Sequence, residues 1–206
     1  MIAEYTTAHA NSFGLNEADL VRAAQKGDLE AFNQLVIIHQ EKIFNLVLRI
    51  LGDEASAEDI TQNTFLAAFR GLARFRNGCF RSWLYRIATN ASYDELRHVK
   101  RHPVLSSEAE DVAEEKFTPL DGMPGLNILP EKEYDRHERE LVLHQALNRL
   151  EKDQRSVIVL VDLHDLDYQE TAQILGIPIG TVKSRLARAR LRLCQLLSPK
   201  GAVSAF

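Results

Sequence analysis

Apolar residues recur along most of this chain at intervals of three and four positions, and no segment alternates apolar and polar residues for long. Such intervals place apolar side chains on one face of an α-helix, whereas a half-buried strand requires alternation. The pattern therefore predicts an all-α fold. Apolar residues make up 45% of the 206 residues, so the chain can form packed cores and global disorder is excluded.

Cap and turn residues divide the first part of the chain into four predicted helices. Asn16 and Asp28 can each cap the helix that follows, and a glycine ends both of these helices. A third helix follows Ser56, and a fourth starts near Phe80 and runs to about position 99. We expect these helices to form a single bundle.

The composition changes at residues 102–130, which contain four prolines, two glycines and a run, "EAEDVAEE", with five acids. Helical periodicity fails there, and a segment of this length without secondary structure is uncommon inside one compact domain. The sequence therefore predicts two small helical domains, residues 15–101 and 131–199, joined by a flexible linker, residues 102–130.

The stretch "IPIGTVKSRLARARLR", residues 177–192, holds five basic residues and no acidic one, although the whole chain has a net charge of -4. On a helix, Val182, Leu186 and Ala189 form a narrow apolar stripe that can pack on a preceding helix. The polar residues Thr181, Ser184, Arg185, Arg188 and Arg192 share another face, and Lys183 lies on the opposite flank. This arrangement favours a DNA-binding face over an ordinary solvated one.

The residues before this stretch strengthen that interpretation. Ala172, Gly176 and Val182 have the spacing of a helix-turn-helix, in which a small residue allows two helices to cross and a glycine makes the turn. Pro178 suits the first turn of a helix. The second helix of such a motif lies in the major groove, with its N-terminal residues nearest the bases.

Two surfaces in the first predicted domain are candidates for partners. Asp59, Gln62, Asn63 and Leu66 share one helical face, and this mixture suits a protein partner, although an ordinary exposed face fits the periodicity equally well. Residues 70–101 carry eight basic residues and two acids, with aromatic residues among them. Basic groups follow phosphates and rings stack on bases, so this segment suits single-stranded nucleic acid, unless the rings belong to the core.

Three motifs in this order, "AEDITQNTFLAAFRGLARFR", "FRSWLYRIATN" and "GTVKSRLARAR", resemble a bacterial RNA polymerase sigma factor of the sigma-70 family. The resemblance is greatest to the extracytoplasmic-function group, which has only regions 2 and 4, and it covers about residues 19–197. It implies an initiation factor that is no enzyme and needs no cofactor or metal. Its partners would be core RNA polymerase, through the β′ clamp helices and the β flap, promoter DNA, and an anti-sigma factor, often membrane-anchored in that group.

The resemblance also implies roles for particular residues. The polymerase-binding residues would be Asp59, Gln62, Asn63 and Leu66, where the family often has an acid in place of Asn63. The residues that capture unpaired bases of the -10 element would be Phe75, Asn77, Phe80, Trp83, Arg86 and Asn90. The residues that read the -35 element would be Thr181, Lys183, Ser184, Arg185 and Arg188.

Two other classes remain open from the residues alone. A stand-alone helix-turn-helix regulator would need a receiver or dimerisation domain, and the first predicted domain lacks the strand–helix alternation of a receiver. A metal-dependent hydrolase could use Asp162, His164, Asp165 and Asp167, together with His98 and His102. Two separate cysteines and the lack of a visible secretory signal lead us to expect a soluble cytoplasmic protein.

Overall fold

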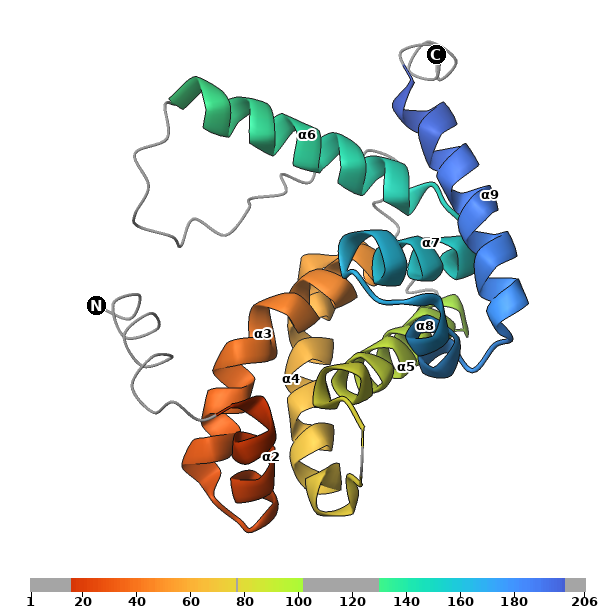
Figure 1. Ribbon diagram of the computed structural model, residues 1–206. Helices are drawn as coiled ribbons and strands as arrows, with labels where there is room; N and C mark the ends of the chain where they lie inside the picture. The colour runs from red at the N-terminus through yellow and green to blue at the C-terminus, as the bar shows by residue number, and fades with distance from the viewer. Residues whose placement is uncertain (1–15, 77, 102–129, 199–206) are drawn as a thin grey trace.

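The computed structural model describes residues 16–76, 78–101 and 130–198, and every regular element in that part of the chain is helical. The predicted all-α fold is confirmed. None of the helices in these ranges is long and apolar enough to cross a membrane. Figure 1 shows the helices as two groups that lie against each other.

The first group consists of α2 (Glu17–Gln25), α3 (Leu29–Leu51), α4 (Glu54–Gly71), a short 3-10 turn η1 (Leu72–Arg74) and α5 (Phe80–Arg101). Asn16 and Asp28 cap α2 and α3 as predicted, each accepting backbone N–H bonds at 3.0–3.1 Å. The cap of α4 is Asp53 and not a residue at the predicted start, since Asp53 accepts a 2.7 Å bond from the Ser56 N–H. The helix therefore begins before Ser56.

The centre of this group is α3, which packs against α2, α4 and α5. Its side chains Leu35, Ile43, Leu46 and Ile50 are buried, and Leu84 of α5 is buried against the same core. Because α3 is covered on several sides by apolar partners, it holds α4 and α5 in fixed positions.

The second group consists of α6 (Pro130–Asn148), α7 (Lys152–Ile158), the π-helical turn η2 (Val159–Leu163), α8 (Tyr168–Leu175) and α9 (Ile179–Leu197). The stretch "KDQRSVIVLVDLH", whose apolar spacing predicts one helix, thus passes from an α-helix into a π-helical turn, a feature that local propensity does not reveal. Asp167 and Glu170 form a capping box at the start of α8, and Gly176 ends α8 with a φ of 64°.

The two groups pack directly on each other. Helix α5 contacts α8, and α3 contacts α6, α7 and η2. The Arg155 guanidinium of α7 donates a 3.0 Å hydrogen bond to the Ile50 carbonyl at the end of α3. The buried apolar residues of both groups form one connected cluster.

The predicted linker, residues 102–130, lies outside the described residues except for Pro130, which is the first residue of α6. Because the two groups share a core, the division into domains 15–101 and 131–199 stays a prediction. In the structure the two groups pack on each other through α3 and α5 of the first group and α6, α7, η2 and α8 of the second. We call this the closed arrangement.

Candidate nucleic-acid and polymerase interface

Helix α9 has the two faces that its sequence predicts. Val182, Leu186 and Ala189 are buried against the rest of the second group. Lys183, Ser184 and Arg188 are exposed, and Thr181 is half-buried. The Arg188 side chain extends along the exposed face, where its Nε–H donates a 3.2 Å bond to the Ser184 carbonyl. This face therefore presents cationic and hydroxyl groups to solvent.

Both flanks of α9 are held by ion pairs. Arg185 lies 2.7 Å from an Asp153 carboxylate oxygen of α7, and its side chain is only 26% exposed. On the other flank, Arg190 donates two hydrogen bonds to Asp162, at 2.9 and 2.6 Å, and these bonds raise the pKa of Arg190. A bidentate pair fixes an arginine in direction as well as position. Of the predicted -35 residues, Arg185 is thus the one that pairs with an acid within the part of the chain that the structure describes.

The helix-turn-helix also has the expected geometry at its turn. Gly176 adopts the left-handed conformation that an L side chain rarely adopts, and the Ile177 N–H bonds to the Ala172 carbonyl at 3.1 Å. The Lys183 ammonium lies 5.9 Å from the centre of the Tyr168 ring. These contacts orient the start of α9, where a DNA-reading helix carries its base contacts.

At the start of α5, three aromatic side chains form a cluster. The ring centroids of Phe75, Phe80 and Trp83 are 4.9–5.9 Å apart in each pair. Phe80 is 3% exposed and belongs to the core, whereas Phe75 and Trp83 are half-buried at its edge. Phe80 therefore supports the other two rings and has no free face for a base.

Two other predicted -10 residues lie further along α5. Arg86 and Asn90 are exposed on α5, one helical turn apart. The Gln25 side chain of α2 donates hydrogen bonds to the carbonyls of Leu72 and Phe75, at 3.1 and 2.6 Å, and so holds the segment before α5. Asn77 lies outside the described residues.

The predicted polymerase-binding residues are brought together on one face of α4. Asp59, Gln62, Asn63 and Leu66 are all exposed, and Leu66 is 52% exposed. Phe69 lies one turn beyond Leu66 and is also exposed, with its ring edge-on to Phe32 at 5.0 Å. The periodicity predicts Phe69 on a buried stripe with Phe65, Ala68 and Leu72, and for Phe69 this prediction is wrong, since its side chain is 47% exposed. Its i, i+3 spacing from Leu66 is the signal that places it on the exposed face.

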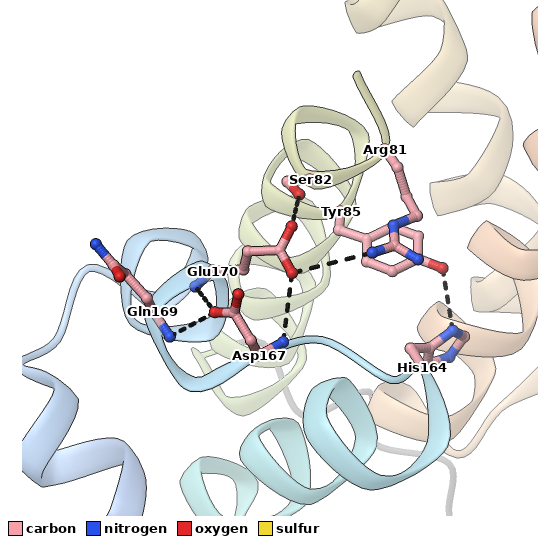
Figure 2. A network of polar contacts seen from close by, with 7 residues as sticks. All are labelled: Arg81, Ser82, Tyr85, His164, Asp167, Gln169 and Glu170. Atoms are coloured by element: carbon pink, nitrogen blue, oxygen red, sulfur yellow. Dashed lines mark hydrogen bonds and ion pairs between the residues drawn. The ribbon is translucent and has the colours of Figure 1, made fainter. Parts of the chain in front are cut away.

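Sequence reasoning also missed the polar contacts between the two groups, which Figure 2 shows. The Ser82 hydroxyl of α5 donates a 2.7 Å bond to Glu170 of α8, and Arg81 lies 3.9 Å from the same carboxylate. The Tyr85 hydroxyl lies 3.2 Å from Nδ1 of His164, and the two rings meet edge to face. One side of α5 is therefore covered by the second group.

The residues of the metal-site alternative are engaged in other contacts. Asp162 binds Arg190, Asp167 caps α8, and His164 contacts Tyr85. Among the residues that the structure describes, no group of three His, Cys, Asp or Glu side chains could hold a metal ion. His102 lies outside those residues.

Two family models match this chain. Residues 35–102 match the family described as Sigma-70 region 2, and residues 140–193 match Sigma-70, region 4. The RNA polymerase sigma-H factor of Pseudomonas aeruginosa is 36% identical over 89% of this chain and 94% of its own length. The ECF RNA polymerase sigma factor SigW of Bacillus subtilis is 37% identical over 82% of this chain and 90% of its own length.

Among solved structures, the sigma factor RpoE of Bartonella quintana, in complex with the anti-sigma factor NepR, matches 81% of this chain and 96% of its own. The TM-score is 0.62 and the sequence identity is 27%. The chain therefore belongs to the RNA polymerase sigma factors of the sigma-70 family. Within that family it is a factor of the extracytoplasmic-function group, and its role is in transcription initiation.

Proposed function

We propose that this sigma factor binds core RNA polymerase and directs it to promoters by reading the -35 element with α9 and capturing unpaired -10 bases beside α5. The observation that carries the proposal is the solvent-facing basic side of α9, opposite its buried stripe, in a helix-turn-helix of regular geometry. No bond needs to be made or broken by the chain for this function.

The -35 readers on α9 are Thr181, Lys183, Ser184 and Arg188, with Arg185 at the edge of the face. Side chains of these types donate to base edges and phosphates in the major groove, and a good bidentate contact discriminates by about 1–3 kcal/mol. Arg188 is the strongest candidate for such a contact, because it is exposed and no acid pairs with it among the described residues.

The -10 surface is built from Phe75, Trp83, Arg86 and Asn90. Unpairing and flipping a base costs a few kcal/mol, and stacking on a ring returns about 1–3 kcal/mol per base. The half-buried rings of Phe75 and Trp83 are held by Phe80 below them, so they offer a preorganised edge for stacking. Asn77, between them in the chain, remains part of this proposal from the sequence alone.

The polymerase contact is the exposed face of α4, Asp59, Gln62, Asn63 and Leu66, extended by Phe69. Apolar side chains flanked by acid and amide groups are typical of the centre and rim of a protein interface. We assign this face to the β′ clamp helices and the second group to the β flap.

An anti-sigma factor is a further proposed partner, supported by the RpoE–NepR complex, and a membrane anchor on that anti-sigma factor stays a prediction.

In vitro transcription tests this proposal directly. Core polymerase, the full chain and a library of promoter sequences should give initiation at a defined subset of sequences. The double variant Asp59→Ala/Leu66→Ala should lose initiation and co-elution with polymerase, while Glu41→Ala, an exposed acid on α3, should keep both. A free chain that binds duplex DNA tightly without polymerase would instead support the stand-alone regulator.

A further inference from the structure

A polar pocket of about 240 Å³ opens between the two groups of helices. Lys42, Asn45 and Arg49 of α3 line one side, and Arg81 and Tyr85 of α5 line another. His164 and Asp165, in the turn between η2 and α8, complete it. Figure 2 shows Arg81, Tyr85 and His164 converging from the two groups.

The lining of this pocket is cationic. Three side chains that carry positive charge face one carboxylate, Asp165, and a second carboxylate, Glu170, lies 3.9 Å from Arg81 at the edge. Burial lowers the pKa of Arg49, and the charge of the nearby Glu140 acts in the opposite direction. Arg49 and Arg81 are half-buried and Lys42 is exposed, and the mutual repulsion of such neighbouring cations favours the binding of an anion.

Two neutral side chains of the pocket, Tyr85 and His164, bond to each other. Burial raises the pKa of Tyr85, so its hydroxyl stays protonated. Burial, reinforced by Arg49, lowers the pKa of His164 to about 4, so its ring is neutral near pH 7. When Nδ1 of His164 accepts the Tyr85 hydroxyl, Nε2 carries the proton, and Nε2 is buried without a hydrogen-bond partner in the described part of the chain.

The backbone of the turn is also unusual. Asp165 has a φ of 53° and is the one non-glycine residue of the described chain in the left-handed region. Such a conformation costs free energy and persists where surrounding contacts hold it. Here it places Asp165 and His164 side by side at the mouth of the pocket.

We propose that this pocket binds a small oxyanion of the phosphate class, and that the bound anion stabilises the closed arrangement of the two groups. Guanidinium and ammonium groups are the side chains that recognise phosphate oxygens. The donors come from α3, α5 and the turn before α8, so only the closed arrangement assembles them all. A ligand that binds one arrangement alone shifts the equilibrium toward it.

Calorimetric titration of the full chain with inorganic pyrophosphate, at constant ionic strength and without magnesium, tests binding. We expect saturable binding that Lys42→Ala weakens about tenfold and that Lys26→Ala, an exposed lysine outside the pocket, leaves unchanged. Nuclear magnetic resonance should show the pKa of His164 rising when pyrophosphate is bound. Equal affinities for the two lysine variants, or an unmoved His164, would overturn the proposal.

Closure is tested separately with the two cysteines of the sequence, Cys79 and Cys194, which are exposed and lie in different groups. Fluorophores on these cysteines report the distance between the two groups of helices. The measurement uses the Ser82→Ala variant, in which closure is weakened. Saturating pyrophosphate should shorten the distance between the fluorophores. If pyrophosphate leaves the distance between the two fluorophores unchanged, the proposal is contradicted. The same holds if single-stranded DNA changes this distance and pyrophosphate alone does not. None of these measurements needs polymerase, so the anion site can be refuted while the proposed function stands. Any effect of the bound anion on transcription rests on the proposed function.

Discussion

Helices α5 and α9 are both proposed to contact the promoter, yet the structure treats them differently. The reading side of α9 faces solvent, while its flanking arginines, Arg185 and Arg190, pair with acids of its own group. Helix α5 instead gives one side to the other group, through Arg81, Ser82 and Tyr85. The proposed -35 face of α9 is thus open to solvent in the closed form, whereas one side of α5 is committed to the second group.

This difference gives the closed arrangement a consequence for function. The covered side of α5 is not the side that carries Arg86 and Asn90, which are exposed, so the closed arrangement fixes the orientation of α5 and leaves the proposed -10 surface open. The net charge of -4 weakens general attraction to phosphate. We therefore expect the free chain to bind promoters poorly.

The largest expected effect is on the contact between α5 and His164. Burial lowers the pKa of His164 from 6.5 to about 4, so between these pH values the unfolded chain takes up a proton that the folded chain refuses. The stability that depends on the neutral form of His164 is fully present above pH 6.5 and is lost as the pH falls. The loss of unfolding free energy is about 3 kcal/mol at pH 4. Urea unfolding at pH 7.5, 6, 5 and 4 measures it.

His164→Gln is the comparison for that series, since glutamine cannot be protonated. Burial also lowers the pKa values of His39 and His144, so both chains lose stability in acid and only their difference belongs to His164. Parallel curves for the two chains from pH 7.5 to 4 would show that the Tyr85–His164 contact carries no such linkage.

The next effect concerns the exposed side of α9. Arg188→Ala should reduce discrimination at one -35 position by about 1–3 kcal/mol, because a direct contact to a base is lost. Arg190→Ala removes the same charge from a side chain committed to Asp162, and should leave the ranking of -35 sequences unchanged. Transcription from a library randomised at -35 measures both. Loss of discrimination in Arg190→Ala but not in Arg188→Ala would move the reading face to the other flank.

A smaller effect is expected from Ser82→Ala on α5. The variant removes a 2.7 Å hydrogen bond to Glu170 and should weaken closure by about 1 kcal/mol, roughly fivefold in the closed-to-open ratio. Fluorophores on Cys79 and Cys194 report the change, and single-stranded -10 DNA should bind the variant and the parent chain equally, because Arg86 and Asn90 are already exposed. Ser56→Ala makes the same chemical change at the start of α4, away from the contact, and should match the parent chain.

Much of this molecule follows from its sequence, because local signals decide most of it. The caps at Asn16 and Asp28, the left-handed turn at Gly176 and the buried stripe of α9 all depend on residues a few positions apart. The exposed face of α4 follows from the same periodicity. Family resemblance then supplied a class that the comparisons confirm, while the role of each site residue remains a prediction.

The remainder depends on contacts between distant residues. Nothing near Phe80 in the chain distinguishes a core ring from a base-stacking one, and its burial is decided by packing against other helices. The bond between Ser82 and Glu170 joins residues 88 positions apart, and Arg185 meets Asp153 only because α7 packs on α9. Periodicity predicts which face of a helix a residue lies on, but tertiary packing decides what that face contacts.

Arg185 provides the smallest expected effect and the closest test of α9. Its pair with Asp153 is partly exposed, and such pairs contribute about 0.2–1 kcal/mol, so Asp153→Asn should barely lower stability. If the pair mainly orients α9, Arg185→Ala should weaken -35 discrimination far less than Arg188→Ala, and adding Asp153→Asn to it should change nothing more. If Arg185 reads a base, as the resemblance implies, Arg185→Ala should instead match Arg188→Ala, and Asp153→Asn alone should sharpen discrimination by releasing the guanidinium to the groove.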